Sequence, residues 1–178
     1  MLAGMVGAPA SSVGPVIIWG NHSSTQFPDA RFTTVTRGSE SVSIASALAS
    51  SLGDAASAGR WLQNEFVHAV QQRGAAVIAK RGASSAGSAA NAICDHVRDW
   101  FNGTNGRIVS MGVVTDGTVY GLPEGLIFSL PVTVAADGTY TVVSDLAVDS
   151  DEFARSMVEA TTKELVNEKT IALATPGK

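Results

Sequence analysis

A histidine placed directly after a predicted strand has the clearest potential for acid–base chemistry in this sequence. His22 follows the apolar run Val16–Trp19 and the pair Gly20-Asn21, and it precedes two serines and a threonine. An imidazole titrates near neutral pH, so it can accept a proton at one stage of a reaction and return it at another. Two interpretations stay open: a proton-transferring histidine, or a structural histidine bonded to its hydroxyl-bearing neighbours. Position alone favours the structural one.

Several other chemistries lack the residue patterns that they need. No two glycines are spaced G-x-G, so the dinucleotide-binding fingerprint is not present in these residues. Nothing in the sequence is typical of a phosphate-binding P-loop or of metal-ligand spacing. The three histidines, His22, His68 and His96, lie far apart and form no paired motif. We therefore expect no metal site.

The composition is that of a globular protein and limits its partners and compartment. Hydrophobic residues make up 45% of the 178 residues and charged residues 16%, which suits one domain with a packed core. A net charge of −4 without a basic cluster argues against a nucleic-acid partner. The single Cys94, expected as a buried thiol, permits no intrachain disulfide. With no basic leader and no membrane-length apolar run, we expect a cytoplasmic protein.

The hydrophobic patterns predict an α+β fold in which helices pack on an antiparallel sheet. Alternating or apolar runs predict strands, and a fourfold spacing of apolar residues predicts helices. The Ala- and Ser-rich stretch 38–59 is compatible with either a helix or a surface loop. The expected strands cover about 13–20, 31–36, 107–115, 126–134 and 139–143, and the expected helices about 62–77, 84–101 and 150–172.

Details of these elements give more specific expectations. Pro131 has no N–H to donate, which places its strand at a sheet edge. Gly74 is expected to interrupt the first long helix. Ser84 or Ser85 is expected to cap the second one. One face of that second helix is expected to point inward; it consists of Ala86, Ala90, Ile93, Val97 and Trp100. In the last helix the residues expected to face inward are Phe153, Met157 and Leu165.

Four stretches of the sequence can be compared with known families: VIIWGNHSSTQFPD (16–29), EFVHAVQQRGAAVIAKRGASSAGSAANAICDHVRDWFNGT (65–104), VSMGVVTDGTVYGLPEGLIFSLPV (109–132) and TTKEL (161–165). They resemble malate dehydrogenases of the cytosolic type. The resemblance covers nearly the whole chain and is weakest at 38–59. The resemblance identifies the chain, residues 1–178, as a member of the lactate/malate dehydrogenase superfamily, corresponding to the C-terminal, substrate-binding and catalytic domain without its Rossmann half.

The resemblance implies an activity and assigns residues to it. The family interconverts (S)-malate and oxaloacetate, a step of the tricarboxylic acid cycle, and passes a hydride to NAD. His22 falls on the histidine that exchanges the proton. Gly74 matches a backbone position close to the substrate, and Ser84 and Ser85 match residues that line the pocket. Where the family usually continues with Met-Ser, this chain has Gly87-Ser88. Relatives are usually homodimers.

Parts of the family's machinery have no counterpart here. The aspartate that orients the histidine and the arginine that binds the substrate carboxylate lie in an Asp-x-x-Arg run upstream of the strand. Asp95–Arg98 has that spacing but belongs to the second helix, and Asp29 is a poor substitute. The determinants that bind the coenzyme and choose between NAD and NADP are also missing. Three interpretations follow: a fragment of a malate dehydrogenase, an inactive short homologue that binds a partner, or a chain that works with a separate coenzyme-binding chain. A fragment would expose apolar surface and self-associate.

Overall fold

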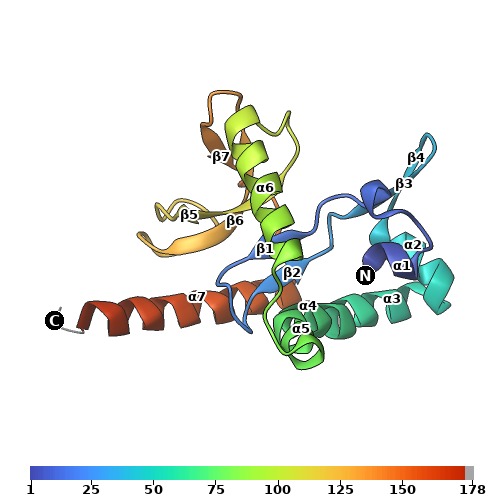
Figure 1. Ribbon diagram of the computed structural model, residues 1–178, viewed down its shortest axis with the longest axis horizontal. Coiled ribbons are helices and arrows are strands. Elements are labelled where there is room, and N and C mark those ends of the chain that lie inside the picture. The colour runs from blue at the N-terminus through green and yellow to red at the C-terminus, as the bar shows by residue number, and fades with distance from the viewer. Residues whose placement is uncertain (175–178) are drawn as a thin grey trace. The chain divides into compact units, whose positions relative to one another are not determined.

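The computed structural model describes residues 1–174, which form two compact units. The first consists of Met1–Ile17 and Pro28–Val70, and the second of Ile18–Phe27 and the described residues from Gln71 onward. The chain passes between the units within the short strands β1 (Ile17–Trp19) and β2 (Phe27–Asp29), which form a two-stranded sheet. Figure 1 labels the elements of both units. No helix in residues 1–174 has both the length and the apolar composition needed to cross a bilayer.

The first unit is a small helical cluster with one hairpin. Strands β3 and β4 pair antiparallel, with Val35 opposite Val42. Its core consists of Leu2, Val6, Ala30, Val35, Ile44, Ala47, Leu48, Ala58 and Phe66. Its elements are α1 (Leu2–Met5), η1 (Ala10–Ser12), β3 (Thr34–Arg37), β4 (Glu40–Ser43), α2 (Ile44–Leu52), α3 (Ala55–Trp61), the π-helical turn η2 (Leu62–Phe66) and α4 (Val67–Gln71).

The Ala- and Ser-rich stretch 38–59 is mostly helical. The Ser43 side chain accepts a hydrogen bond from the amide of Ser46 and caps α2. Asp54 does the same for α3 through the amide of Ser57. Between the two helices Gly53 adopts a φ of +98°, which lets the chain turn. Two N-caps and one glycine therefore divide a low-complexity sequence into two short helices.

The second unit places a long helix and two exposed helices around an antiparallel sheet. The sheet order is β5-β6-β7, with Met111 opposite Leu130 and Val132 opposite Val142. The α+β class predicted from the sequence is confirmed. The elements are α5 (Arg73–Arg81), α6 (Gly87–Asn102), β5 (Val109–Val114), β6 (Ile127–Val134), β7 (Tyr140–Val142) and α7 (Glu152–Ala174).

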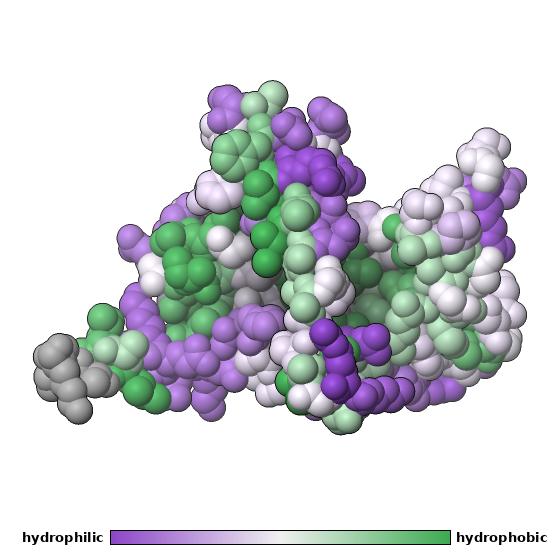
Figure 2. Space-filling model, viewed as in Figure 1, coloured by the Kyte–Doolittle hydropathy of each residue, from purple (hydrophilic) through white to green (hydrophobic). Residues whose placement is uncertain are grey.

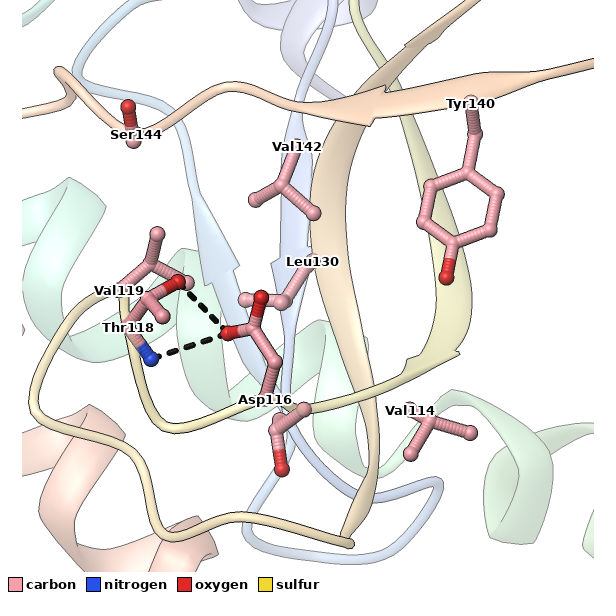
Figure 3. Close-up of a pocket in the computed structure, with 9 residues that line it drawn as sticks. Val114, Asp116, Thr118, Val119, Leu130, Tyr140, Val142 and Ser144 are labelled. Carbon is pink, nitrogen blue, oxygen red and sulfur yellow. Dashed lines mark hydrogen bonds between the residues drawn. The ribbon is translucent and has the colours of Figure 1, made fainter.

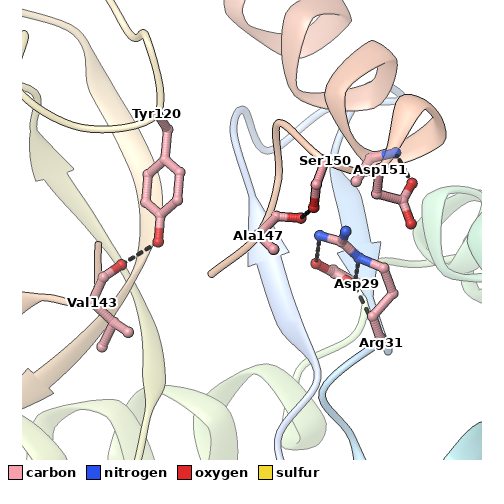
Figure 4. Close-up of polar contacts among 8 residues, drawn as sticks. Asp29, Arg31, Tyr120, Val143, Ala147, Ser150 and Asp151 are labelled. Atoms are coloured by element: carbon pink, nitrogen blue, oxygen red, sulfur yellow. Dashed lines mark hydrogen bonds and ion pairs between the residues drawn. The ribbon is translucent and has the colours of Figure 1, made fainter. Parts of the chain in front are cut away.

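Strand β6 lies in the centre of its sheet, so the expectation that Pro131 marks an edge is wrong. The amide of Val143 donates to the Pro131 carbonyl over 2.9 Å, just beyond the end of β7. The proline has no N–H to return to the Val143 carbonyl. The Tyr120 hydroxyl donates to that carbonyl instead (Figure 4). A side chain from the β5–β6 loop thus supplies the hydrogen bond that the proline cannot make.

Removing the Tyr120 hydroxyl should destabilise the protein. Burial raises the pKa of Tyr120, so the hydroxyl stays protonated and able to donate. In Tyr120→Phe the Val143 carbonyl loses its donor, at a cost of about 1–3 kcal/mol in the free energy of unfolding. Urea unfolding measures this cost. Tyr140→Phe is the control, because that ring is 45% exposed, and a surface change of this kind costs at most about 0.5 kcal/mol. Equal effects of the two substitutions would contradict the assignment.

Helix α6 presents its apolar face outward, against the expectation from its periodicity. The helix has no buried residue, and Ile93 and Trp100 are 63% and 52% exposed. Figure 2 shows apolar atoms along this helix. Cys94 is exposed rather than buried. The N-cap is Ala86, without a side-chain hydrogen bond, instead of Ser84 or Ser85. The pattern is amphipathic as expected, but nothing in residues 1–174 buries its apolar side.

Helix α7 buries a line of residues shifted from the one expected. Ala154, Val158 and Thr161 are its buried residues. The expected inward residues Phe153, Met157 and Leu165 are half-buried beside that line. Phe153 makes an edge-to-face contact with Phe27 at 5.8 Å between ring centroids. The centre of the packed face is therefore lined by small side chains, which let the helix approach its neighbours closely.

Candidate functional site

Strand β1 ends at a point held by the central sheet of the second unit. The Gly20 amide and carbonyl exchange hydrogen bonds of 3.1 Å with Ser129 of β6. The Ser129 hydroxyl also donates to the Ile18 carbonyl over 2.6 Å, and the Ser110 hydroxyl accepts from the Ile18 amide over 2.9 Å. Trp19 is fully buried, and its ring meets that of Tyr120 at nearly a right angle with 4.8 Å between the ring centroids. The chain therefore leaves β1 in a fixed direction at Gly20.

Gly20 lies against helix α7 more closely than any other residue type could. Its φ is +84°, and a Cβ atom there would lie 2.2 Å from both Oγ1 and Cγ2 of Thr161. Thr161 itself is fully buried. Glycine both adopts the left-handed backbone and leaves room for the helix. This close approach fixes the loop of residues 20–26, which carries His22.

The His22 side chain is exposed, and its neighbours in sequence bind elsewhere. Within residues 1–174 no hydrogen bond or ion pair involves its ring. Ser23 and Thr25 bond to each other and to α7 rather than to the histidine. The structure therefore does not show the structural alternative, in which flanking hydroxyls would bind the imidazole. The ring is accessible at the end of a rigid strand.

A carboxylate on α7 holds the residues on both sides of His22. Glu164 Oε2 accepts hydrogen bonds from Asn21 Nδ2 at 3.0 Å, from Ser23 Oγ at 2.5 Å and from Thr25 Oγ1 at 2.5 Å. Figure 1 shows the loop between β1 and β2 reaching α7. The hydrogen bonds from Ser23, then Thr25, then Asn21 hold the pKa of Glu164 below its ordinary value of 4.5. The carboxylate is therefore ionised in the pH range where a histidine titrates.

Acid should release this loop from α7. A carboxyl whose folded-state pKa is depressed contributes stability that is fully present above its unfolded-state value, 4.5 for Glu164. That stability is lost as the pH falls through the lower folded-state value. Two other ionisable groups belong to this region. Glu168 accepts a hydrogen bond from Asn21 Nδ2 at 3.0 Å, and His22 is part of the loop itself. Amide hydrogen exchange of residues 21–25 should accelerate below about pH 4.5 beyond its intrinsic pH dependence. An acid profile unchanged by Glu164→Gln would contradict this origin.

The other residues expected in the site lie on separate exposed segments of the second unit. Gly74 is the second residue of α5, and a Cβ there would meet nothing within 4 Å. The helix is interrupted two residues earlier, at Gln72. Ser84 and Ser85 are in the connection between α5 and α6, where Arg81 Nη1 donates to the Ser84 carbonyl over 2.7 Å. No hydrogen bond within residues 1–174 joins these three residues to His22.

Neither carboxylate considered from the sequence is available as a partner for an imidazole. Both oxygens of the buried Asp29 accept hydrogen bonds from the Arg31 guanidinium, at 3.0 and 2.8 Å (Figure 4). Asp95 pairs with Arg98 at 2.6 Å on the exposed surface of α6. The second pair is an ordinary exposed helix pair, of little energetic weight.

A separate cavity of about 310 Å³ lies between the sheet of the second unit and the β5–β6 loop. Figure 3 shows Asp116 pointing into it from the loop, with Tyr140 and Ser144 at its sides. Hydrogen bonds from the Thr118 hydroxyl and amide hold the pKa of Asp116 below its usual value. None of the four site residues predicted from the sequence lines this cavity; these are His22, Gly74, Ser84 and Ser85. Among residues 1–174, no three His, Cys, Asp or Glu side chains are grouped as metal ligands.

Two residues that hold the loop, Thr161 and Glu164, were not predicted from the sequence. Both lie on α7, about 140 positions from His22 in the chain. Their spacing with Glu168 (three, then four residues) places polar groups on one face of the helix. The same spacing is typical of a solvated helix face. The sequence alone therefore does not distinguish a polar face that binds the loop from one that meets only solvent.

Comparisons with known proteins agree on one family. The sequence profile of the lactate/malate dehydrogenase α/β C-terminal domain matches residues 1–175. Over 168 residues, 94% of this chain, the sequence is 49% identical to a probable malate dehydrogenase 3 of Dictyostelium discoideum and 46% identical to the cytoplasmic malate dehydrogenase of Bos taurus. The aligned region is 47% of each relative, so the chain spans about half the length of the curated relatives it matches.

Solved structures give the same result at the level of the fold. A malate dehydrogenase from Naegleria fowleri superimposes with a TM-score of 0.79 at 38% identity, over 96% of this chain and 47% of that one. The lactate dehydrogenase of Trichomonas vaginalis, solved in complex with NADH and oxamate, superimposes with a TM-score of 0.85 at 29% identity, over 97% of this chain and 49% of that one. The chain is a member of the lactate/malate dehydrogenase family, and its residues 1–175 match the α/β C-terminal domain of that family.

Proposed function

We propose that the protein carrying this domain is a malate dehydrogenase that interconverts (S)-malate and oxaloacetate, with His22 as the proton acceptor and donor. The observation that carries the proposal is the exposed imidazole at the end of β1, on a loop held by Gly20 and Glu164. Relatives that are 46–49% identical are named malate dehydrogenases. The substrate is therefore a small dicarboxylic acid.

His22 would act at the hydroxyl group of malate. Carbon 2 becomes a carbonyl when its hydride leaves for the nicotinamide coenzyme, which would be held by the other half of the enzyme. The neutral imidazole accepts the hydroxyl proton, and in the reverse direction the imidazolium returns it to the carbonyl oxygen. A residue with this task must be accessible and fixed in direction, because misplacement by about 1 Å can cost about a hundredfold in rate. Gly74 would allow the α5 backbone to approach the substrate, and Ser84 and Ser85 would line its pocket.

The coenzyme of the proposed reaction does not fit the residues described here. A dinucleotide needs a glycine-rich turn between a parallel strand and a helix. The β3–β4, β5–β6 and β6–β7 pairs are antiparallel, and the sequence has no G-x-G spacing. The proposal therefore assigns NAD, with NADP as the alternative, to the half of the dehydrogenase that these residues do not span. The Trichomonas lactate dehydrogenase, of which this chain covers 49%, was solved in complex with NADH and oxamate.

The carboxylate that orients His22 and the arginine that binds the substrate would come from that same half. Asp29 and Asp95 are engaged by arginines of their own. An imidazole held in one tautomer by a carboxylate is the better base, and a guanidinium suits a carboxylate substrate through two parallel hydrogen bonds. We further propose a cytoplasmic homodimer without nucleic-acid or membrane partners, in keeping with relatives named as cytoplasmic.

An activity assay of the native protein tests this proposal. The polypeptide that carries this sequence is captured from its source with an antibody against residues 36–43, which are exposed on the β3–β4 hairpin, together with any associated chain. We expect it to oxidise NADH in the presence of oxaloacetate, and to do so much more slowly with pyruvate, which lacks the second carboxylate. NADPH is assayed in parallel. Failure of the captured protein to oxidise either coenzyme with oxaloacetate overturns the proposal.

The exposed face of α6 supports a second candidate, an inactive homologue that binds a partner. Ile93, Val97, Trp100 and Phe101 are 42–72% exposed on this helix, more than a solvated helix needs. This candidate predicts a stable complex that is lost in Trp100→Glu and unaffected by His22→Gln. A complex without oxaloacetate-dependent NADH oxidation would favour it over the dehydrogenase.

A further inference from the structure

The loop that carries His22 is attached to α7 through residues on both sides of the histidine. Asn21, Ser23 and Thr25 are one residue before, one after and three after His22, and each donates to the same oxygen of Glu164. His22 and Ser24, the other residues of this segment, are exposed. The bonds thus fix the backbone around the histidine and leave its side chain accessible.

The backbone of the segment is held by the same helix. The Asn21 amide donates to Thr161 Oγ1 over 2.8 Å, and the Thr25 hydroxyl lies 3.0 Å from that oxygen. Thr161 is fully buried and in contact distance of Gly20. Thr161 belongs to the buried face of α7, so it offers the loop an acceptor on a packed helix. Thr161 is one turn before Glu164, so both attachments belong to one rigid face.

Without α7 the segment has little to hold it. The turn inside it contains one backbone hydrogen bond, from the Gln26 amide to the Ser23 carbonyl at 3.3 Å, and the Ser23 hydroxyl accepts from the Thr25 amide. A carboxylate accepts several short hydrogen bonds because it is charged and has two oxygens with free lone pairs. A neutral acceptor of the same length would keep the geometry with weaker bonds.

We propose that Glu164, supported by Thr161, is a positioning residue that fixes the His22 loop in the orientation needed for proton transfer. This inference rests on the proposed function, since it assigns a role to the loop only if His22 acts in catalysis. Glu164 contacts the residues beside His22 and not the ring, so it acts through the backbone of the loop. Glu168 adds one exposed hydrogen bond to Asn21 and has a secondary part.

The first test is structural and needs no activity. Nuclear magnetic resonance of the native protein that carries this sequence measures amide exchange at residues 21–25 and the relaxation of the His22 ring. Glu164→Ala should speed exchange at least tenfold and broaden or sharpen the His22 ring signals, while Glu164→Gln should lie between it and the parent. The matched control is Glu159→Ala, because Glu159 is on the same helix, 72% exposed, and bonded only weakly to Arg155. Exchange at residues 21–25 equal in Glu164→Ala and Glu159→Ala overturns the inference.

The second test is kinetic and uses the native enzyme identified by the oxaloacetate assay. Glu164→Ala should lower kcat roughly 10- to 100-fold with KM changed less than about threefold, because a displaced base affects the proton transfer more than substrate binding. Glu164→Gln should restore part of kcat, and the melting temperature should change little. A rise in KM alone, or loss of kcat only in proportion to lost folded protein, overturns the positioning role.

The two arms separate failure of this inference from failure of the proposed function. If Glu164→Ala leaves the loop rigid while His22→Gln abolishes turnover, the proposed function stands and the positioning role is wrong. If Glu164→Ala frees the loop but neither it nor His22→Gln changes turnover, His22 is not the base and the proposed function is wrong together with the role built on it.

Discussion

Replacing His22 with glutamine should lower the kcat of oxaloacetate reduction by two to four orders of magnitude, the usual contribution of a general acid–base group. Glutamine is close to histidine in size and can form hydrogen bonds, but its amide neither gains nor loses a proton near neutral pH. The ring is exposed and without hydrogen-bond partners in residues 1–174. The substitution should therefore leave the fold and its stability unchanged, so the loss would be purely chemical.

A matched histidine provides the control for this substitution. His96 is exposed on α6, beside the Asp95–Arg98 pair, and has no assigned role. His96→Gln should keep kcat within about twofold, and both variants should keep the circular dichroism and melting temperature of the parent. The shape of the pH–rate profile should change in His22→Gln and stay that of the parent in His96→Gln, because only the first substitution removes the proposed acid–base group. Full activity of His22→Gln would remove the basis of the proposed mechanism.

Replacing Gly20 with alanine should destabilise the second unit by roughly 2–5 kcal/mol, the sum of a left-handed backbone penalty and an overpacking penalty. The φ of +84° is unfavourable for any side chain, and the new Cβ would lie 2.2 Å from two atoms of Thr161. Thr161 is fully buried in α7, so it can move away only by displacing close-packed neighbours. Against a total stability of about 5–15 kcal/mol, this loss is large.

A second glycine separates the two contributions. Gly106 has a similar φ of +77°, but a Cβ there would meet nothing within 4 Å. Gly106→Ala should therefore cost only the backbone part, about 1–2 kcal/mol. In a double-mutant cycle, Thr161→Ala should recover part of the loss in Gly20→Ala, although not all of it, because the Thr161 Cβ would itself lie 2.7 Å from the new atom. Equal costs at Gly20 and Gly106 in denaturant unfolding would show that α7 does not approach the loop as described.

The sequence alone was sufficient for the family, the fold class and most elements of the second unit. The period of the pattern separates the strands 109–114 and 127–134 from the helix 87–102, because strands and helices repeat side chains at different intervals. The position of His22 just after a strand also follows from local sequence. The roles of His22, Gly74, Ser84 and Ser85 stay predictions that rest on resemblance.

Other features depend on contacts that no local pattern contains. Pro131 occupies the central strand because Tyr120, 11 positions earlier in the sequence, donates to the carbonyl that the proline leaves unpaired. An amphipathic helix such as α6 specifies an apolar face but not what covers it, so its outward orientation was not predictable.

Only the tertiary structure could reveal the attachment of the His22 loop to α7. The loop and Glu164 are joined by hydrogen bonds across 139 to 143 positions of sequence. The periodicity of a segment reports which of its faces is apolar, whereas a polar face can meet either solvent or a partner with the same pattern. The sequence by itself determined that a histidine follows β1. The folding of α7 against Gly20 decided how that histidine is held, because bonds between distant residues exist only once packing has brought them together.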